Sequence, residues 1–132
     1  TCALPISTRA RTGFSLVEML AAVAIIGVIS FLAIPNLVKV RGDAELNLTI
    51  ARCESLNMAM ATYIQVRGRT QAASDWSGAS TSQAKYALIS PYLAFSETNL
   101  TDYIINGYTV TFNSIDPLRK VTLTQGTTVI PY

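Results

Sequence analysis

The feature that most constrains this chain is an uninterrupted run of twenty uncharged, mostly apolar residues from Met19 to Val38. As an α-helix rising about 1.5 Å per residue, the run would span about 30 Å, the thickness of the hydrocarbon core of a bilayer. Arg9 and Arg11 precede the run, and Lys39 and Arg41 follow it. The sequence therefore predicts one membrane-spanning helix, and the uneven lengths of its flanks favour a cytoplasmic N-terminus.

A cleavable secretory signal is the main alternative interpretation of this segment, because a basic start followed by an apolar run is typical of one. The run is longer than the usual apolar core of about 7 to 15 residues, and no small-x-small cleavage site follows it. A carboxylate, that of Glu18, also stands at its front edge. These features favour a segment that the mature protein retains.

Glu18 is the only charged residue between Arg11 and Lys39. A carboxylate near the start of a span costs roughly a few kcal/mol unless it is neutralised or paired, which makes it a candidate functional residue. Two interpretations stay open. Glu18 can lie among lipid headgroups, where the positive end of the helix dipole favours it. If the chain is cut after Gly13, Glu18 can instead pair with the new ammonium of Phe14, on its own or a neighbouring helix.

The residues around this carboxylate resemble the N-terminal motif of type IV pilins and type II secretion pseudopilins. The motif here reads G-F-S-L-V-E-M from Gly13, followed by the apolar run with Pro35 near its end. The resemblance implies that a prepilin peptidase cuts after Gly13 and methylates the new N-terminus, Phe14. It also implies that Glu18 pairs with the N-terminus of a neighbouring subunit during assembly, and that the helix loosens at Pro35 in the filament.

The expected fold is therefore α+β and pilin-like, with a long N-terminal helix packed against a small antiparallel sheet. The expected protein is a homo-oligomeric filament subunit of a pilus or a secretion pseudopilus, built through an inner-membrane assembly platform. It would be a single-pass inner-membrane protein surrounded by lipid before assembly, and part of a periplasmic or extracellular filament afterwards. The expected segments are a leader peptide (1–13), a transmembrane or filament-core helix (14–38), the amphipathic half of that helix (39–67), a connecting loop with a short helix (68–101) and an antiparallel β-meander (102–132).

The half of the helix beyond Pro35 is predicted to be amphipathic. Pro35 lacks a backbone donor and its ring crowds the preceding turn, so we expect a kink or local loosening over residues 31–35. Arg67, Gly68 and Arg69 predict the end of the helix. Apolar residues recur before that end at spacings of three and four, on one helical face: Leu46, Ile50, Cys53, Leu56, Met60 and Ile64.

The segment after the helix is predicted to hold a loop and a short helix. Thr70–Ser82 is rich in small and polar residues and predicts a surface loop that Trp76 packs down. Gln83–Phe95 predicts a short helix that Pro91 limits. Its inward residues are expected to be Ala84, Ala87, Leu88 and Tyr92.

The C-terminal segment is predicted to form three or four antiparallel strands, because β-branched and aromatic residues alternate there with turn signals. The turn signals are Asn106-Gly107 and Gln125-Gly126. By the two-residue period, Tyr108, Val110 and Phe112 share the face expected to cover the helix. The expected strands are Tyr103–Ile105, Tyr108–Asn113, Lys120–Thr124 and Thr127–Ile130.

The residue inventory argues against an enzyme or a metal site. The chain has no histidine, which removes the commonest general base and the commonest metal ligand. Cys2 and Cys53 are too few for a four-cysteine site. The acids that follow the long helix are scattered singly, unlike a calcium site, and are expected to be solvated surface acids: Asp75, Glu97, Asp102 and Asp116. We therefore expect no catalytic residue, no metal and no cofactor.

The charge balance disfavours a nucleic-acid partner. Ten basic residues stand against eight acidic ones, a formal charge of +2, and both basic residues before Gly13 would leave with the leader. Binding would need a local patch such as Arg67, Arg69, Lys85, Arg119 and Lys120. The second function that stays open is a membrane-anchored binding module that never polymerises. Its head, the part of the chain beyond the membrane span, would bind a ligand, a polysaccharide or DNA.

Overall fold

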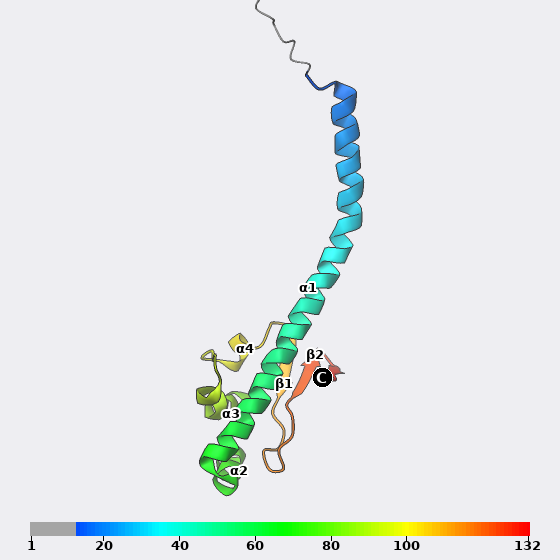
Figure 1. The fold of residues 1–132 in the computed structure, drawn as a ribbon. Helices are drawn as coiled ribbons and strands as arrows, with labels where there is room; N and C mark the ends of the chain where they lie inside the picture. Colours follow the sequence, from blue (N-terminus) through cyan, green and yellow to red (C-terminus); the bar gives the residue numbers. More distant parts are fainter. Residues whose placement is uncertain (1–12) are drawn as a thin grey trace, which may run out of the picture. The chain divides into compact units, whose positions relative to one another are not determined.

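The computed structural model describes residues 13–132, so the expected leader lies outside the described residues except for Gly13. The chain divides into two compact units, one ending at Val40 and the other running from Arg41 to Tyr132. Helix α1 (Leu16–Arg67) begins in the first unit and ends in the second (Figure 1).

The described part of the first unit consists of residues 13–15 and the start of α1. All of its side chains are exposed, including bulky apolar ones such as Phe31, which is 80% exposed. This stretch of α1 is long and apolar enough to cross a membrane. Pro35 lies inside α1 and the helix continues on both sides of it, so the proline does not end the helix. The expected loosening at Pro35 stays a prediction.

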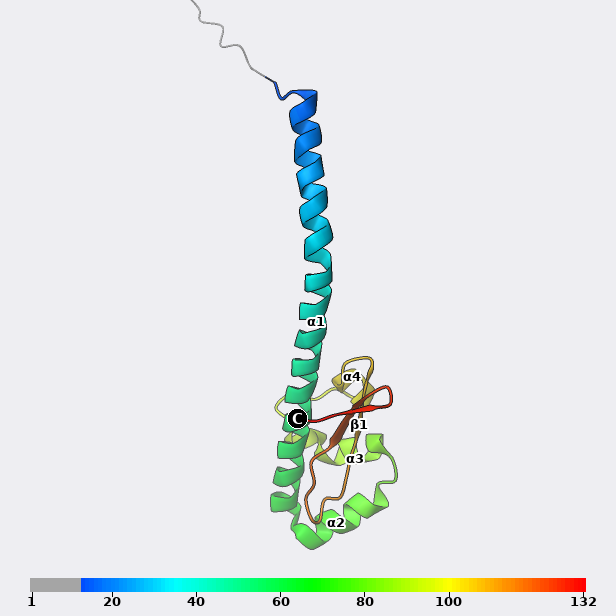
Figure 2. The ribbon, with the colours of Figure 1, turned by 90° about the vertical axis from the view of Figure 1, so that its right-hand side faces the viewer.

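The second unit, residues 41–132, is the head of the protein. It holds the hydrophobic core, to which α1 contributes one face. Cys53, Leu56 and Met60 of the predicted apolar stripe are fully buried, and Leu46, Ile50 and Ile64 are partly buried. Ala59 and Tyr63, which belong to the same face, are buried as well. The predicted amphipathic half of the long helix is therefore confirmed. Figure 2 shows that α2, α3, α4 and the strands lie along this part of α1.

A three-stranded antiparallel sheet supplies the other side of this core. Its strands are β1 (Tyr108–Thr111), β2 (Thr122–Gln125) and β3 (Thr128–Ile130), in the order β1-β2-β3. Val110 pairs with Leu123, and Leu123 pairs with Ile130. Val110, Phe112 and Leu123 are buried in the cluster that contains Cys53 and Met60. The structure thus confirms a long helix packed with a small antiparallel sheet, and the predicted inward face of β1.

Three glycines adopt the left-handed backbone that ends or turns an element. Gly68 has a φ of 82°, directly after the last residue of α1. Gly107 and Gly126 have φ values of 92° and 60°, before β1 and between β2 and β3. Side chains with a Cβ rarely adopt such values. The predicted helix end at residues 67–69 and both predicted turns are therefore confirmed.

The prediction of a loop over Thr70–Ser82 was wrong, because helix α2 (Arg69–Gly78) occupies most of it. Ala72 and Trp76 lie four positions apart on one face of α2 and are both buried. The Trp76 indole donates from Nε1 to the carbonyl of Asn113 at 2.9 Å, and its ring meets Phe112 edge to face. Packing against distant residues therefore stabilises a helix that its polar composition alone does not predict.

The short helix after it is α3 (Ser82–Ile89), followed by a 3₁₀ turn (Ser90–Tyr92) that contains Pro91. The hydroxyl of Thr81 caps α3 by accepting from the Ala84 amide at 3.1 Å. The predicted helix is thus confirmed in a shorter form. The inward residues were partly misassigned, because Tyr86 and Ile89 are fully buried whereas Ala87 is exposed.

The predicted strand Tyr103–Ile105 is not formed. A one-turn helix, α4 (Leu100–Tyr103), occupies its start, and Tyr103 and Ile104 are both buried. Consecutive buried residues do not fit a half-buried strand, in which side chains alternate between faces. The Arg52 guanidinium also donates to the Tyr103 carbonyl, which a strand would use in its ladder.

Candidate functional site

The candidate site is the start of α1, where the predicted cleavage junction lies. Gly13, Phe14 and Ser15 are non-helical, and α1 begins at Leu16. Phe14 is 85% exposed, and among residues 13–132 no heavy atom beyond the chain neighbours of Gly13 lies within 4 Å of the position that a Cβ on Gly13 would take. The Gly13–Phe14 peptide bond is therefore open to an approaching enzyme.

Ser15 and Glu18 form a reciprocal capping box at this helix start. The Ser15 amide donates to Glu18 Oε2 at 2.7 Å, and the Glu18 amide donates to Ser15 Oγ at 3.2 Å. The Met19 amide donates to the Ser15 carbonyl at 3.1 Å, which makes Ser15 the N-cap residue. This arrangement satisfies two amides that a helix terminus otherwise leaves without partners.

Glu18 was predicted as a functional residue, whereas the role of Ser15 was not predicted. The signal was present, because Ser-x-x-Glu directly before an apolar run is typical of a capping box. The structure thus brings Glu18, Ser15 and Phe14 together at one helix end. Pro35 lies far along α1 from them.

The capping box occupies only one of the two carboxylate oxygens of Glu18. Within residues 13–132, Oε1 accepts no hydrogen bond and no lysine or arginine forms an ion pair with Glu18. The carboxylate is exposed beside exposed apolar side chains, such as those of Leu16 and Leu20. Within the described residues, nothing therefore competes with a cation supplied from elsewhere.

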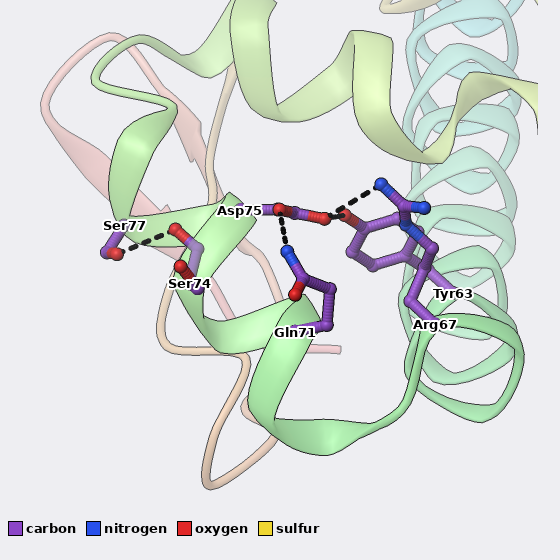
Figure 3. Close-up of polar contacts among 6 residues, drawn as sticks. All are labelled: Tyr63, Arg67, Gln71, Ser74, Asp75 and Ser77. Carbon is purple, nitrogen blue, oxygen red and sulfur yellow. Dashed lines mark hydrogen bonds and ion pairs between the residues drawn. The ribbon is translucent and has the colours of Figure 1, made fainter.

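A second polar cluster lies in the head, around the carboxylate of Asp75 (Figure 3). Tyr63 Oη donates to Asp75 Oδ2 at 2.8 Å, and Arg67 Nη2 lies 3.1 Å from the same oxygen. Gln71 Nε2 donates to Oδ1 at 2.7 Å. Ser77 Oγ donates to the carbonyl of Ser74 on the same helix, but this bond does not involve Asp75.

The contacts of Asp75 stabilise the packing of α2 against α1 and do not form a reactive site. The hydrogen bonds from Gln71 and Tyr63, together with the Arg67 charge, lower the pKa of Asp75. Burial, followed by the hydrogen bond to Asp75, raises the pKa of Tyr63. Tyr63 and Arg67 belong to α1 whereas Gln71 and Asp75 belong to α2, so the cluster holds α2 against the end of α1. The expectation that Asp75 is a plain surface acid was wrong.

We expect replacement of Asp75 by asparagine to lower the Tm of the protein and to flatten its dependence on pH. A carboxylate whose folded pKa is lowered gives stability above its ordinary pKa of about 3.9, and that stability is lost as pH falls through the lowered value. Thermal unfolding between pH 2 and pH 7 checks this. Asp43→Asn, at an exposed carboxylate on α1, is the matched control. Equal pH profiles for Asp75→Asn and wild type would contradict the role of Asp75.

The remaining reactive side chains of the described residues do not gather into a site. Burial raises the pKa of the Cys53 thiol to about 11, so the group stays a protonated core residue at neutral pH. Within residues 13–132, no three cysteine, aspartate or glutamate side chains come close enough to hold a metal ion.

Most of the basic residues considered for nucleic-acid binding contact acidic or aromatic partners. Arg67 pairs with Asp75, and Arg69 Nη1 lies 3.6 Å from Asp116. Lys120 Nζ lies 2.8 Å from Glu54. Lys85 Nζ lies over the Trp76 ring, 5.5 Å from its centroid. These contacts reduce the free positive charge that a phosphate backbone would require.

The comparisons with known proteins point to the same helix start. The family model described as the prokaryotic N-terminal methylation motif matches residues 8–34, about a fifth of the chain. The match covers the Gly13–Phe14 junction, the capping box and most of the apolar run. A search of curated proteins and a search of solved structures found no match to this chain.

Proposed function

We propose that this chain, which carries the prepilin signature of type IV pilins and pseudopilins, is a structural subunit of a pilus or pseudopilus filament. A prepilin peptidase cuts it after Gly13 and methylates Phe14. The signature points to a structural rather than a catalytic protein family. The subunit waits in the inner membrane with its N-terminus in the cytoplasm, and an assembly platform transfers it into a periplasmic or extracellular filament.

The observation that carries this proposal is the exposed carboxylate of Glu18 at the start of an exposed apolar helix. From Leu16 to Val40, every side chain of α1 is solvent-exposed in the isolated chain, and nearly all of them are apolar. Such a surface requires lipid or other apolar helices around it. A charge placed there is costly unless a cation accompanies it.

Cleavage after Gly13 would create that cation. The new N-terminus at Phe14 is an ammonium, and it lies next to Ser15, whose amide already bonds Glu18. In a filament core of packed apolar helices, the Glu18 carboxylate of one subunit and the Phe14 ammonium of its neighbour neutralise each other in a medium of low dielectric constant. The pairing therefore favours assembly over a lone subunit and sets the register between neighbours.

The runner-up function is a membrane-anchored binding module that never polymerises. Its Glu18 would lie among lipid headgroups at the helix N-terminus, a dipole interaction worth about 0.3 to 1 kcal/mol. Such a module has no need of the Glu18 charge for its location or its binding. Variants at Glu18 therefore separate the two functions.

Processing gives the first test. Mass spectrometry of the native membrane protein is expected to find N-methylated Phe14 at its N-terminus. Gly13→Leu is expected to leave uncut precursor in the membrane, because a bulky residue blocks the junction for the peptidase without clashing inside the chain itself. Gly27→Leu, also in open space on α1, is the control and is expected to be cut normally. A wild-type protein with an intact leader, or a cut beyond residue 30 as a signal peptidase would make, would contradict the proposal.

A further inference from the structure

We propose that Ser15 is a positioning residue for the cleavage reaction. Its capping box with Glu18 starts α1 at Leu16 and thereby keeps the Gly13–Phe14 peptide bond in exposed, non-helical chain. This inference rests on the proposed function, because it concerns the junction that the peptidase is proposed to cut. It assigns Ser15 a task separate from the role of Glu18 in assembly.

The hydrogen bonds place the boundary of the helix two residues beyond the junction. The first backbone bond of the helix runs from the Met19 amide to the Ser15 carbonyl at 3.1 Å. The amides of Ser15 and Glu18 are satisfied by side chains rather than by carbonyls further upstream. The carbonyl of Gly13, which the peptidase must attack, therefore takes no part in the helix.

Without this cap, the helix start would move upstream rather than downstream. Between Leu16 and Ser30 the only polar side chain is that of Glu18, so no new cap is at hand on that side. Fraying there would also leave amides without partners in lipid, which costs several kcal/mol for each. Upstream, Thr12 carries a hydroxyl of the kind that N-caps prefer.

A helix capped at Thr12 would include the Gly13–Phe14 peptide bond in its first turn. The Val17 amide would then donate to the carbonyl of Gly13, following the i to i−4 pattern. The scissile carbonyl would sit in a helical hydrogen bond, and chain whose backbone is hydrogen-bonded in a helix is a poor substrate for proteolysis. Ser15 thus sets the fraction of molecules whose junction is competent for binding.

The test compares cleavage of the full chain in proteoliposomes by a purified prepilin peptidase. Ser15→Ala is expected to lower kcat/KM by up to about fivefold, because the loss of an N-cap commonly shifts the equilibrium between two helix starts by that factor. The kcat at saturating substrate is expected to stay unchanged, because only the competent fraction falls. Ser15→Thr and Ser15→Asp keep a capping oxygen and are expected to be cut nearly as fast as wild type.

Substitutions at Glu18 distinguish a capping role from a direct contact between the Ser15 hydroxyl and the peptidase. Glu18→Gln keeps an acceptor for the Ser15 amide and is expected to be cut at a rate close to that of wild type. Glu18→Ala removes the other hydrogen bond of the cap, the one from the Ser15 amide, and leaves the Ser15 hydroxyl in place, so it is expected to slow cleavage as well. A Glu18→Ala chain that is cut at the wild-type rate would overturn the capping role.

A measurement without the peptidase examines the helix start itself. In Ser15→Ala, hydrogen exchange of the Leu16 and Val17 amides is expected to slow, since both would gain upstream carbonyl partners. Unchanged exchange, or a wild-type kcat/KM in Ser15→Ala, would overturn the inference while leaving cleavage after Gly13 intact. A wild-type chain that the peptidase never cuts at this junction would overturn the proposed function and this inference together.

Discussion

Glu18→Ala is expected to abolish filaments or reduce them strongly while the protein stays in the membrane. Losing the carboxylate leaves the Phe14 ammonium of the neighbouring subunit without its partner in an apolar core. Membrane insertion is expected to persist, because removing a charge from the span makes insertion easier. Filament yield is measured by electron microscopy of sheared material, and membrane content is measured by immunoblotting of the cell fractions.

The control for this substitution is Asp43→Ala. Asp43 is an exposed acid on the same helix, beyond the apolar run, and is expected to be dispensable for the ion pair. Ser15→Ala is a second comparison, because it removes the cap but keeps the charge of Glu18. If Glu18→Ala forms filaments at wild-type levels, the proposed pairing is wrong and the membrane-anchored module becomes the better account.

Val110→Asp is expected to unfold the head. Val110 is 4% exposed and belongs to the core cluster that joins β1 and β2 to the buried face of α1. An unpaired carboxylate at this position costs on the order of 4 kcal/mol or more, a large part of the stability of a small domain. Residues 41–132 form a compact unit with this core, so a fragment beginning at Arg41 is expected to fold as a monomer and to serve as the test material.

The matched control lies on the neighbouring residue of the same strand. Thr109 is exposed on the opposite face of β1, so Thr109→Asp places the same charge in water. Circular dichroism and urea unfolding are expected to show a folded Thr109→Asp fragment and an unfolded Val110→Asp fragment. A well-folded Val110→Asp head would show that this face of β1 does not pack into the core.

The sequence predicted those parts of the fold whose cause is local. The apolar run, the three- and four-residue spacing of Cys53, Leu56 and Met60, and the glycines at 68, 107 and 126 each carry their signal within a few residues. A long helix, its end, the turn before β1 and the hairpin turn between β2 and β3 follow from them. The signal of the proposed junction is local as well, because Gly13 and Glu18 belong to the motif that the family model matches, and cleavage there stays a prediction.

The elements that the sequence mispredicted depend on partners far along the chain. Helix α2 is held by Trp76, which bonds the carbonyl of Asn113, and by Asp75, which binds side chains of α1. The turn at Tyr103 is fixed by the guanidinium of Arg52. Composition and periodicity describe a segment in isolation, so neither could show that a polar stretch becomes helical once such partners surround it.

The role of Ser15 was missed for a different reason. Its signal, Ser-x-x-Glu before an apolar run, is local, but the pattern alone does not show that the two side chains bond the amides at the helix start, as they do in the structure. The bonds show one task of the Glu18 carboxylate, and the proposed function adds a second. Glu18 completes the helix start in the uncut chain and, in the proposed function, pairs with a neighbour after cleavage.

Filament assembly by Glu18→Gln is the measurement that tests the central claim most directly. Glutamine has the shape of glutamate and keeps an acceptor for the Ser15 amide, so the capping box and the helix start are preserved while the charge is lost. If the charge of Glu18 draws neighbouring subunits together, electron microscopy will find few or no filaments of Glu18→Gln beside abundant filaments of wild type. Wild-type amounts of Glu18→Gln filaments would contradict the claim.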